Sequence, residues 1–144
     1  MQLTKFSDYA LRVLMYAECA GDRLVTIDEI SEAYGISRAH LMKVVNALTR
    51  AGFLTAMRGR SGGLKLAKPA HSIVLGDVVR STETNFDLVE CFSTGNHCVI
   101  TGCCRLPRVL NEALQAFIEV LDGYTLANVA LKPKTFAVTT SRSR

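Results

Sequence analysis

Apolar residues recur at intervals of three or four along the first third of the chain, which is the pattern of amphipathic helices. The pattern predicts three helices, over about residues 4–20, 26–34 and 38–51. Ser37 is a good amino-terminal cap for the third helix. Because the second and third helices are separated by a tight turn containing Gly35, we expect them to form a helix-turn-helix unit.

The periodicity changes to that of short strands after the third helix. Residues 53–57 and 64–66 read as two strands joined by a glycine-rich turn that contains Arg58 and Arg60. A short helix over about residues 72–83 follows. The predicted fold class is mainly α with a small β-hairpin, in which a winged helix-turn-helix domain over residues 1–83 is followed by a long dimerisation helix.

The long helix is predicted over about residues 105–122, where apolar residues form a stripe that is broad for so small a domain. The same helix of a second copy in a symmetric dimer is the expected cover. The alternative is that the helix packs back on its own domain. We assign residues 105–131 to this helix and the short turn after it, and residues 132–144 to a flexible tail rich in Ser, Thr and Arg.

Residues 84–104 show no helical or strand periodicity, and this loop contains four of the five cysteines. Unstructured loops of that length are usually functional or organised by a ligand. Zinc could use the ligands Cys91, His97, Cys98 and either Cys103 or Cys104, but the short Cys-x2-Cys pairs typical of structural zinc are absent. The wide spacing of these cysteines favours an iron-sulfur cluster.

The compartment expected from the sequence is the cytoplasm, where thiols stay reduced. Asp8, Arg12 and Glu18 interrupt the apolar residues of the amino terminus, so it does not read as a secretory signal. No stretch reaches the roughly 18 apolar residues of a membrane span. Cys19, inside the first predicted helix, is expected to be a small buried apolar residue.

The net charge is only +4, but residues 33–71 contain seven basic side chains and no Asp or Glu. Such a segment suits a polyanion such as double-stranded DNA, although a solvated basic face without a ligand is the alternative. If the third helix lies in the major groove, its apolar face points inward and its polar face meets the DNA. The residues expected at the DNA are Ser37, Arg38, Ala39, His40, Lys43, Asn46 and Arg50 on that helix, and Arg58 and Arg60 on the wing.

Residue chemistry suggests how these contacts divide. Arg38 could pair with guanine and Asn46 with adenine, whereas Ser37, Lys43 and Arg50 suit phosphates. The thin wing tip suits the adjacent minor groove. An enzyme would need a nucleophile, a base and an orienting group brought together, and the sequence shows no such motif. We therefore expect no catalytic activity.

Several segments together resemble the iron-sulfur winged-helix regulators that include IscR and NsrR, and they are most similar to the NsrR-like repressors that sense nitric oxide. These segments are MQLTKFSDYALR, SRAHLMKVVNALTRAGFLTA, RGRSGGLKLAKPA, IVLGDVVRSTE and CVITGCCRL. The resemblance covers nearly the whole chain. It implies a homodimeric transcription regulator, expected to be a repressor, that binds inverted-repeat operator DNA and is released when nitric oxide modifies or dismantles its cluster.

The resemblance also implies a set of cluster ligands. Cys91, Cys98 and Cys104 would be the thiolate ligands, with the adjacent Cys103 leaving the choice within that pair open. Asp8 of the partner subunit would be the fourth ligand. IscR-like proteins use a histidine three residues after the last cysteine, where this chain has Pro107. A 4Fe-4S cluster is favoured over 2Fe-2S.

Asp8 has a simpler explanation as well, because a carboxylate in the first turn of a helix is stabilised by the positive end of the helix dipole. Two further functions stay open at this point. One is a regulator of the same fold that senses iron-sulfur or redox status, and the other is a zinc-stabilised winged-helix DNA-binding protein.

Overall fold

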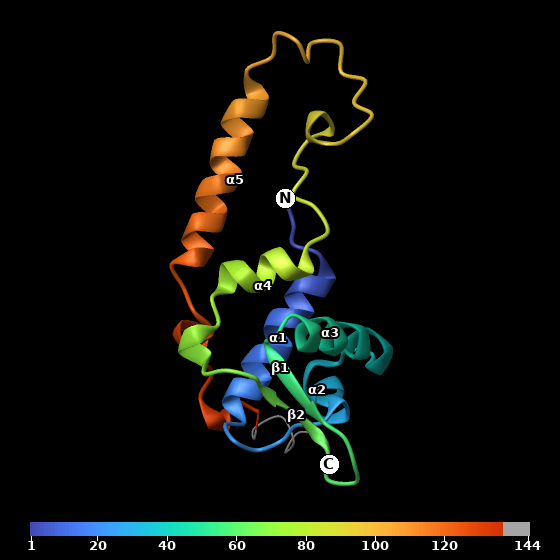
Figure 1. The fold of residues 1–144 in the computed structure, drawn as a ribbon, viewed down its shortest axis with the longest axis vertical. Coiled ribbons are helices and arrows are strands. Elements are labelled where there is room, and N and C mark those ends of the chain that lie inside the picture. Colours follow the sequence, from blue (N-terminus) through green and yellow to red (C-terminus); the bar gives the residue numbers. More distant parts are fainter. Residues whose placement is uncertain (137–144) are drawn as a thin grey trace.

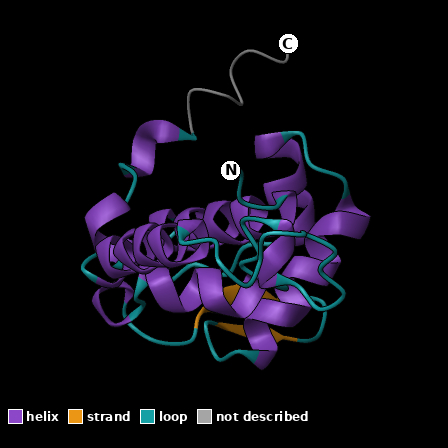
Figure 2. Ribbon diagram, turned by 90° about the horizontal axis from the view of Figure 1, so that it is seen from above, coloured by secondary structure: helices purple, strands orange, loops and turns teal. Residues whose placement is uncertain are grey.

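The computed structural model describes residues 1–136 and shows five α-helices and one antiparallel hairpin in that range (Figure 1). In chain order these elements are α1 (Lys5–Cys19), α2 (Ile27–Tyr34), α3 (Arg38–Arg50), β1 (Leu54–Met57), β2 (Gly63–Leu66), α4 (Leu75–Thr82) and α5 (Leu106–Asp122). Figure 2 shows how helices dominate the molecule and how the two strands lie together at one edge of that view. The predicted fold class, a winged helix with a long additional helix, is confirmed.

The helix boundaries follow the local signals in the sequence. Thr4, Thr26 and Ser37 are the amino-terminal caps of α1, α2 and α3, and each side chain accepts a hydrogen bond from a backbone N–H three residues later. At α2 the side chain of Glu29 reaches back to the backbone N–H of Thr26, which completes a capping box. Gly35 ends α2 with a φ of 65°, a left-handed conformation that glycine adopts without strain.

The hairpin pairs Leu54 with Leu66 at its base and Met57 with Gly63 near its tip. Val25, in the loop before α2, adds an isolated antiparallel bridge to Leu64. Gly63 permits this close approach, because a Cβ at that position would lie 2.7 Å from the carbonyl oxygen of Val25. Strand β2 is thereby joined to the loop before α2 through Gly63 and Leu64, at the tip end of the paired region.

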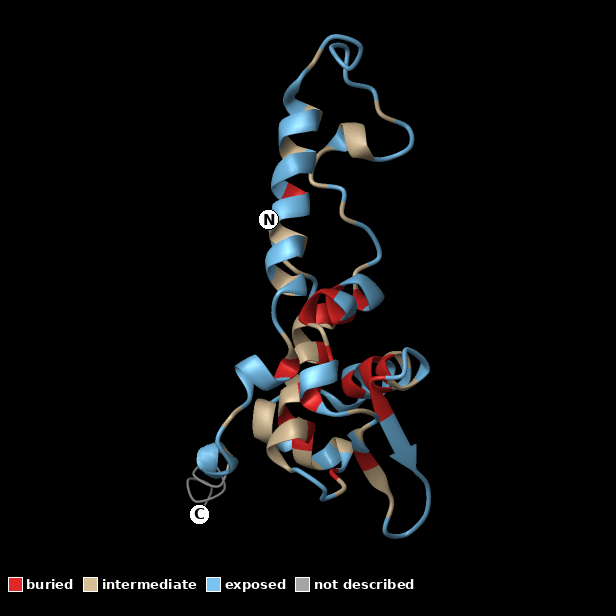
Figure 3. Cartoon of the chain, turned by 60° about the vertical axis from the view of Figure 1, so that its left-hand side comes forward, coloured by how far each residue is buried: buried red, intermediate tan, exposed pale blue. Residues whose placement is uncertain are grey.

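The hydrophobic core lies where α1 packs against the helix-turn-helix, the hairpin and α4. Figure 3 shows buried residues concentrated in this part of the molecule. Ser7 of α1 and Thr82 of α4 share a buried hydrogen bond of 2.8 Å between their hydroxyl groups. The short helix expected after the wing therefore packs on the winged-helix body. The fully buried large side chains of the core include Leu14, Ile30, Leu41, Leu48, Ile73, Val78 and Leu126.

Helix α5 extends away from this body and contacts it mainly through α4 (Figure 1). The guanidinium of Arg80 on α4 donates to both carboxylate oxygens of Asp122 at the end of α5, with one N···O distance of 2.8 Å. Leu114 is the one buried side chain of α5, whereas Leu106, Val109 and Val120 are 55–60% exposed. The chain on its own therefore leaves most of the apolar stripe of α5 uncovered.

Part of the segment expected to be a flexible tail is packed against the core. Pro133–Thr135 form a 3-10 helix, and the ring of Phe136 lies 4.6 Å from that of Tyr16 and 5.5 Å from that of Tyr34, measured between centroids. The prediction was wrong for residues 132–136 because Phe136 supplies an aromatic anchor within a polar stretch. Residues 137–144 lie outside the described residues.

Candidate DNA-binding surface and cysteine loop

Helix α3 presents its polar side to solvent because its apolar side is used by the core. Leu41, Val44, Val45 and Leu48 are buried, which leaves the opposite face free. All nine residues predicted to contact DNA are exposed, seven on or just before α3 and two at the wing tip. These residues therefore lie on two exposed surfaces, the polar face of α3 and the wing tip. Their role in DNA binding stays a prediction.

Arg38 is paired in the structure. Its guanidinium lies 2.8 Å from a carboxylate oxygen of Asp28 on α2, and both side chains remain more than 60% exposed. The sequence analysis missed this partner, because Asp28 lies outside the acid-free segment and reaches α3 only through the helix-turn-helix fold. An exposed pair of this kind is weak, so it leaves Arg38 available to another acceptor.

Two other polar side chains, at the start and the end of α3, make local hydrogen bonds. The hydroxyl oxygen of Ser37 accepts a hydrogen bond from the backbone N–H of His40, and Nε of Arg50 donates to the carbonyl of Asn46 over 3.4 Å. At the wing tip Gly59 has a φ of 118°, which turns the chain between the exposed Arg58 and Arg60. The wing therefore carries two cations at its outermost point.

The cysteine loop follows α4 and leads back to α5 at the far end of the molecule (Figure 1). Between residues 83 and 105 no side chain is buried. Local hydrogen bonds shape the loop instead: Asn96 accepts from the backbone of Cys98 at 2.8 Å, and the carbonyl of Ile100 accepts from the backbone of Cys103 and of Cys104. A segment without a core of its own is one that a bound metal group could organise.

The thiols of this loop form no disulfide with one another, and their exposure differs. Cys98 and Cys103 are exposed, whereas Cys91 and Cys104 are half-buried. Within residues 1–136, three or more metal-ligating side chains do not come together at any one point. The predicted ligands of one chain are therefore not assembled into a site by that chain alone.

Asp8 lies in the first turn of α1 and pairs with Arg12 one turn later. The two side chains are joined by an N···O distance of 2.8 Å and by a hydrogen bond from Nε of 3.0 Å, and each is a little over 40% exposed. This hydrogen bond to Asp8 raises the pKa of the Arg12 guanidinium. The pair is compatible with both explanations of Asp8, since the carboxylate is oriented yet still accessible.

Cys19 differs from the expectation of a buried apolar residue. It is half-buried at the end of α1, and its thiol donates to the carbonyl of Lys132 over 3.4 Å. Burial raises the pKa of the thiol, which keeps it protonated. Cys19 therefore plays a structural part beside the carboxyl-terminal segment.

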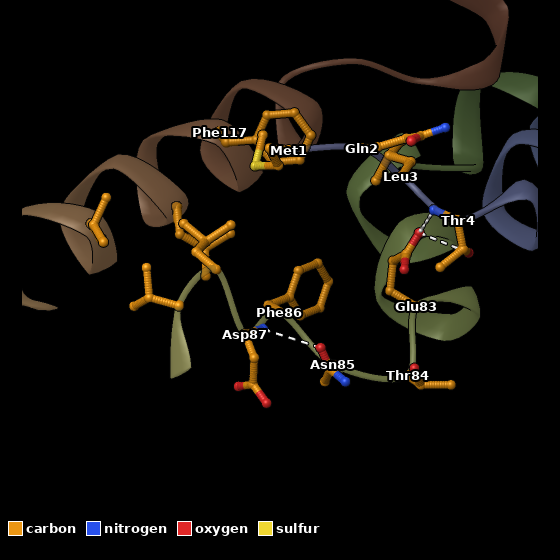
Figure 4. Close-up of a pocket in the computed structure, with 14 residues that line it drawn as sticks. Met1, Gln2, Leu3, Thr4, Glu83, Thr84, Asn85, Phe86, Asp87 and Phe117 are labelled. Carbon is orange, nitrogen blue, oxygen red and sulfur yellow. Dashed lines mark hydrogen bonds between the residues drawn. The ribbon is translucent and has the colours of Figure 1, made fainter. Parts of the chain in front are cut away.

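A groove of about 830 Å³ separates the amino terminus, the start of the cysteine loop and α5. In Figure 4 the side chains of Met1 and Phe117 lie together on one side, and Phe86 lies on the other. Glu83 connects the start of the cysteine loop to the amino terminus, because its carboxylate accepts hydrogen bonds from the backbone N–H and the hydroxyl of Thr4.

In the part of the chain that the structure describes, no helix is long and apolar enough to cross a membrane.

Comparison with solved structures supports the same architecture. A transcriptional regulator from Listeria innocua, described as putative, shares 25% identity with a TM-score of 0.73 over 90% of this chain and 85% of that chain. The oxidized form of Staphylococcus aureus CymR shares 24% identity with a TM-score of 0.72 over 90% of this chain and 96% of its own. T. potens IscR shares 22% identity with a TM-score of 0.70 over 100% of this chain and 93% of its own.

Residues 3–132 match the model of the Rrf2 family, which is described as an iron-dependent transcriptional regulator. That range spans the winged helix, the cysteine loop and α5. The chain therefore belongs to the Rrf2 family and is a winged-helix transcription regulator.

Proposed function

We propose that this protein is a cytoplasmic, homodimeric repressor that binds inverted-repeat operator DNA and holds an iron-sulfur cluster that reacts with nitric oxide. The observation that carries the proposal is the loop of residues 84–104, which has four free cysteines and no buried side chain in a member of the Rrf2 family. Several thiols on a loop without a core of its own suit an iron-sulfur cluster that organises the segment.

The dimer is supported by α5. Leu106, Val109 and Val120 on this helix are exposed, and its other apolar side chains Leu110, Leu114 and Phe117 line the groove beside the amino terminus. A second copy of α5 related by a two-fold axis would cover this surface with its own identical stripe. The alternative expected from sequence, packing of α5 on its own domain, is met mainly by its contact with α4.

The donor set fits an iron-sulfur cluster. Cys91, Cys98 and Cys104 supply soft thiolate ligands, which iron-sulfur clusters require. Because three thiolates leave a four-iron cluster one ligand short, Asp8 of the partner subunit completes the set in this proposal. The bound 4Fe-4S cluster would supply a centre that reacts with nitric oxide.

The protein's own residues explain how such a ligand could affect DNA binding. A carboxylate is a harder ligand than a thiolate, so Asp8 is the weakest donor of the four. Arg12 orients this carboxylate on α1, and α1 packs directly against α3. A bond from Asp8 to the other subunit would therefore fix the position of α1 and of the recognition helix across the dimer. Loss of this bond would mean that the distance between the two recognition helices is no longer fixed.

A mixed dimer tests whether Asp8 acts across subunits. One subunit would carry Asp8→Ala and the other Cys91→Ala, with different affinity tags for purification. If Asp8 ligates the partner's cluster, this dimer keeps one complete ligand set and shows the unaltered wild-type visible spectrum at half intensity. If Asp8 acts within its own subunit, the surviving cluster has the altered spectrum of the Asp8→Ala homodimer. If Asp8 is only a helix-start carboxylate, the Asp8→Ala homodimer itself keeps the wild-type spectrum, and that result overturns the ligand role.

A regulator of the same fold that reads redox status through its thiols is the second candidate, and the exposure of Cys98 and Cys103 favours it. Iron, sulfide and zinc analysis of anaerobically purified protein distinguishes the candidates. Iron with matching sulfide supports the cluster. Protein without metal supports the thiol sensor, and stoichiometric zinc supports a zinc-stabilised DNA-binding protein.

A further inference from the structure

A second, smaller pocket lies between the start of α1 and the middle of α3. Its volume is about 210 Å³, and it is lined by Lys5, Phe6, Tyr9, His40, Lys43 and Val44. Small-molecule sites usually measure about 300 Å³ or more, so this pocket suits a fragment of a larger ligand rather than a whole small molecule. Val44 belongs to the hydrophobic core and Phe6 and Tyr9 pack on its edge, whereas Lys5, His40 and Lys43 lie outside the core.

The pocket combines an apolar floor with a basic rim. Val44 is buried and Phe6 and Tyr9 are half-buried, whereas Lys5, His40 and Lys43 are exposed. The Tyr9 ring lies against His40, with 6.3 Å between ring centroids. No carboxylate lines the pocket, and the neighbouring Asp8 is already paired with Arg12. The rim is therefore a cationic edge around an apolar depression.

We propose that this pocket seats one deoxyribose-phosphate unit of the operator backbone. The sugar would pack on Phe6 and Tyr9, and the phosphate would lie between the ammonium groups of Lys5 and Lys43. A nucleotide backbone unit combines an apolar sugar with an anion, which is the combination that this pocket offers. The inference rests on the proposed function, namely that α3 faces duplex DNA.

Continuity with α3 favours DNA over other ligands. Lys43 belongs both to the pocket and to the polar face of α3 that the fold presents to solvent. A recognition helix in the major groove is flanked by the phosphates of the adjoining backbone, and contacts to them fix its register. Lys5 would extend the DNA interface from the helix-turn-helix and the wing to α1.

The test compares Lys5→Ala with Lys134→Ala, a control at an exposed lysine of the carboxyl-terminal segment. The full-length holo-protein is titrated with an operator duplex, selected in vitro with the wild-type protein, and with an unrelated duplex at several salt concentrations. Lys5→Ala is expected to weaken binding to both duplexes by a similar factor. It is also expected to lower the slope of log K against log salt by about one per subunit, whereas Lys134→Ala leaves both unchanged.

A neutral methylphosphonate placed at successive operator phosphates then locates the contact. At one position in each half-site, wild type and Lys5→Ala should bind the modified duplex equally. The inference is overturned if Lys5→Ala matches Lys134→Ala in affinity and slope while Lys43→Ala still weakens binding, a result that leaves the proposed function intact. It is also overturned if Lys5→Ala changes the dimer equilibrium without DNA, since the pocket would then be a subunit contact. Failure of the wild-type protein to select or bind any duplex overturns both.

Discussion

The ion pair between Arg38 and Asp28 makes the proposed base contact of Arg38 testable. A bidentate pair between arginine and guanine contributes about 1 to 3 kcal/mol to discrimination against other bases. Arg38→Ala should therefore lower operator affinity by about 5- to 150-fold for each half-site and should relax the preference at one base position in each half-site. Selection of operators from a random duplex pool measures that preference.

Asp28→Asn tests the same ion pair from its other side, because it removes the charge that Arg38 pairs with. The Arg38 and Asp28 side chains are 62% and 64% exposed, so their 2.8 Å pair contributes no more than about 0.5 kcal/mol after solvent screening. Arg38 must leave this pair to reach a base. Removing the Asp28 charge should therefore strengthen operator binding by about twofold for each half-site, and thermal unfolding should show little change.

The double variant separates a specific effect from general electrostatics. If Asp28 acts by holding Arg38, Asp28→Asn has little effect on affinity when Arg38 is already Ala. The reasoning is refuted if the gain from Asp28→Asn is the same in both backgrounds. An Arg38→Ala protein that binds operator and unrelated DNA with equal losses would likewise show that Arg38 contacts only phosphates.

Three further outcomes follow from the structure. Cys103→Ala should keep the visible absorbance of the cluster and Cys104→Ala should lose it, as read from the spectra of anaerobically purified proteins; the reverse result would exchange their roles. Phe136→Ala should lower the free energy of unfolding by about 2 kcal/mol in urea titrations, because it removes an aromatic group packed on two tyrosine rings. Its failure to do so would mean that the segment does not stabilise the core. Hydrogen bonding to Arg80 lowers the pKa of Asp122, so this pair stabilises the fold above the ordinary pKa of the carboxyl and is lost as the pH falls through the lowered value. The difference in melting temperature between wild type and Asp122→Asn should therefore shrink in acid, and a constant difference would count against the pair.

Local signals in the sequence were sufficient to predict the helices and the hairpin. Thr26 and Glu29 form a capping box from residues three positions apart, and Gly35 takes the left-handed conformation that ends α2. Such features depend on residues a few positions apart, so they are readable before the chain folds. Phe136 was missed because its packing partners, Tyr16 and Tyr34, lie about a hundred residues earlier in the chain.

The candidate sites were predictable only in part, for the same reason. The outward face of α3 follows from helical periodicity, but the Arg38–Asp28 pair depends on the angle between two helices. Nothing in the sequence indicated a DNA contact at Lys5, because Lys5 comes close to Lys43 only when α1 packs on α3. The choice of Asp8 came from family resemblance. In a single chain it pairs with Arg12, and its proposed ligand role requires a second subunit.

If a nitric-oxide-sensitive cluster controls operator binding, loss of the cluster and release of DNA must occur together in one anaerobic titration. Holo-protein bound to a fluorescent operator duplex is titrated with nitric oxide while visible absorbance and fluorescence anisotropy are recorded from the same sample. The cluster absorbance and the bound fraction of DNA are expected to fall together, and Cys103→Ala is expected to behave like the wild type. Loss of the absorbance with no release of DNA, or a colourless protein whose DNA binding ignores nitric oxide, would contradict it.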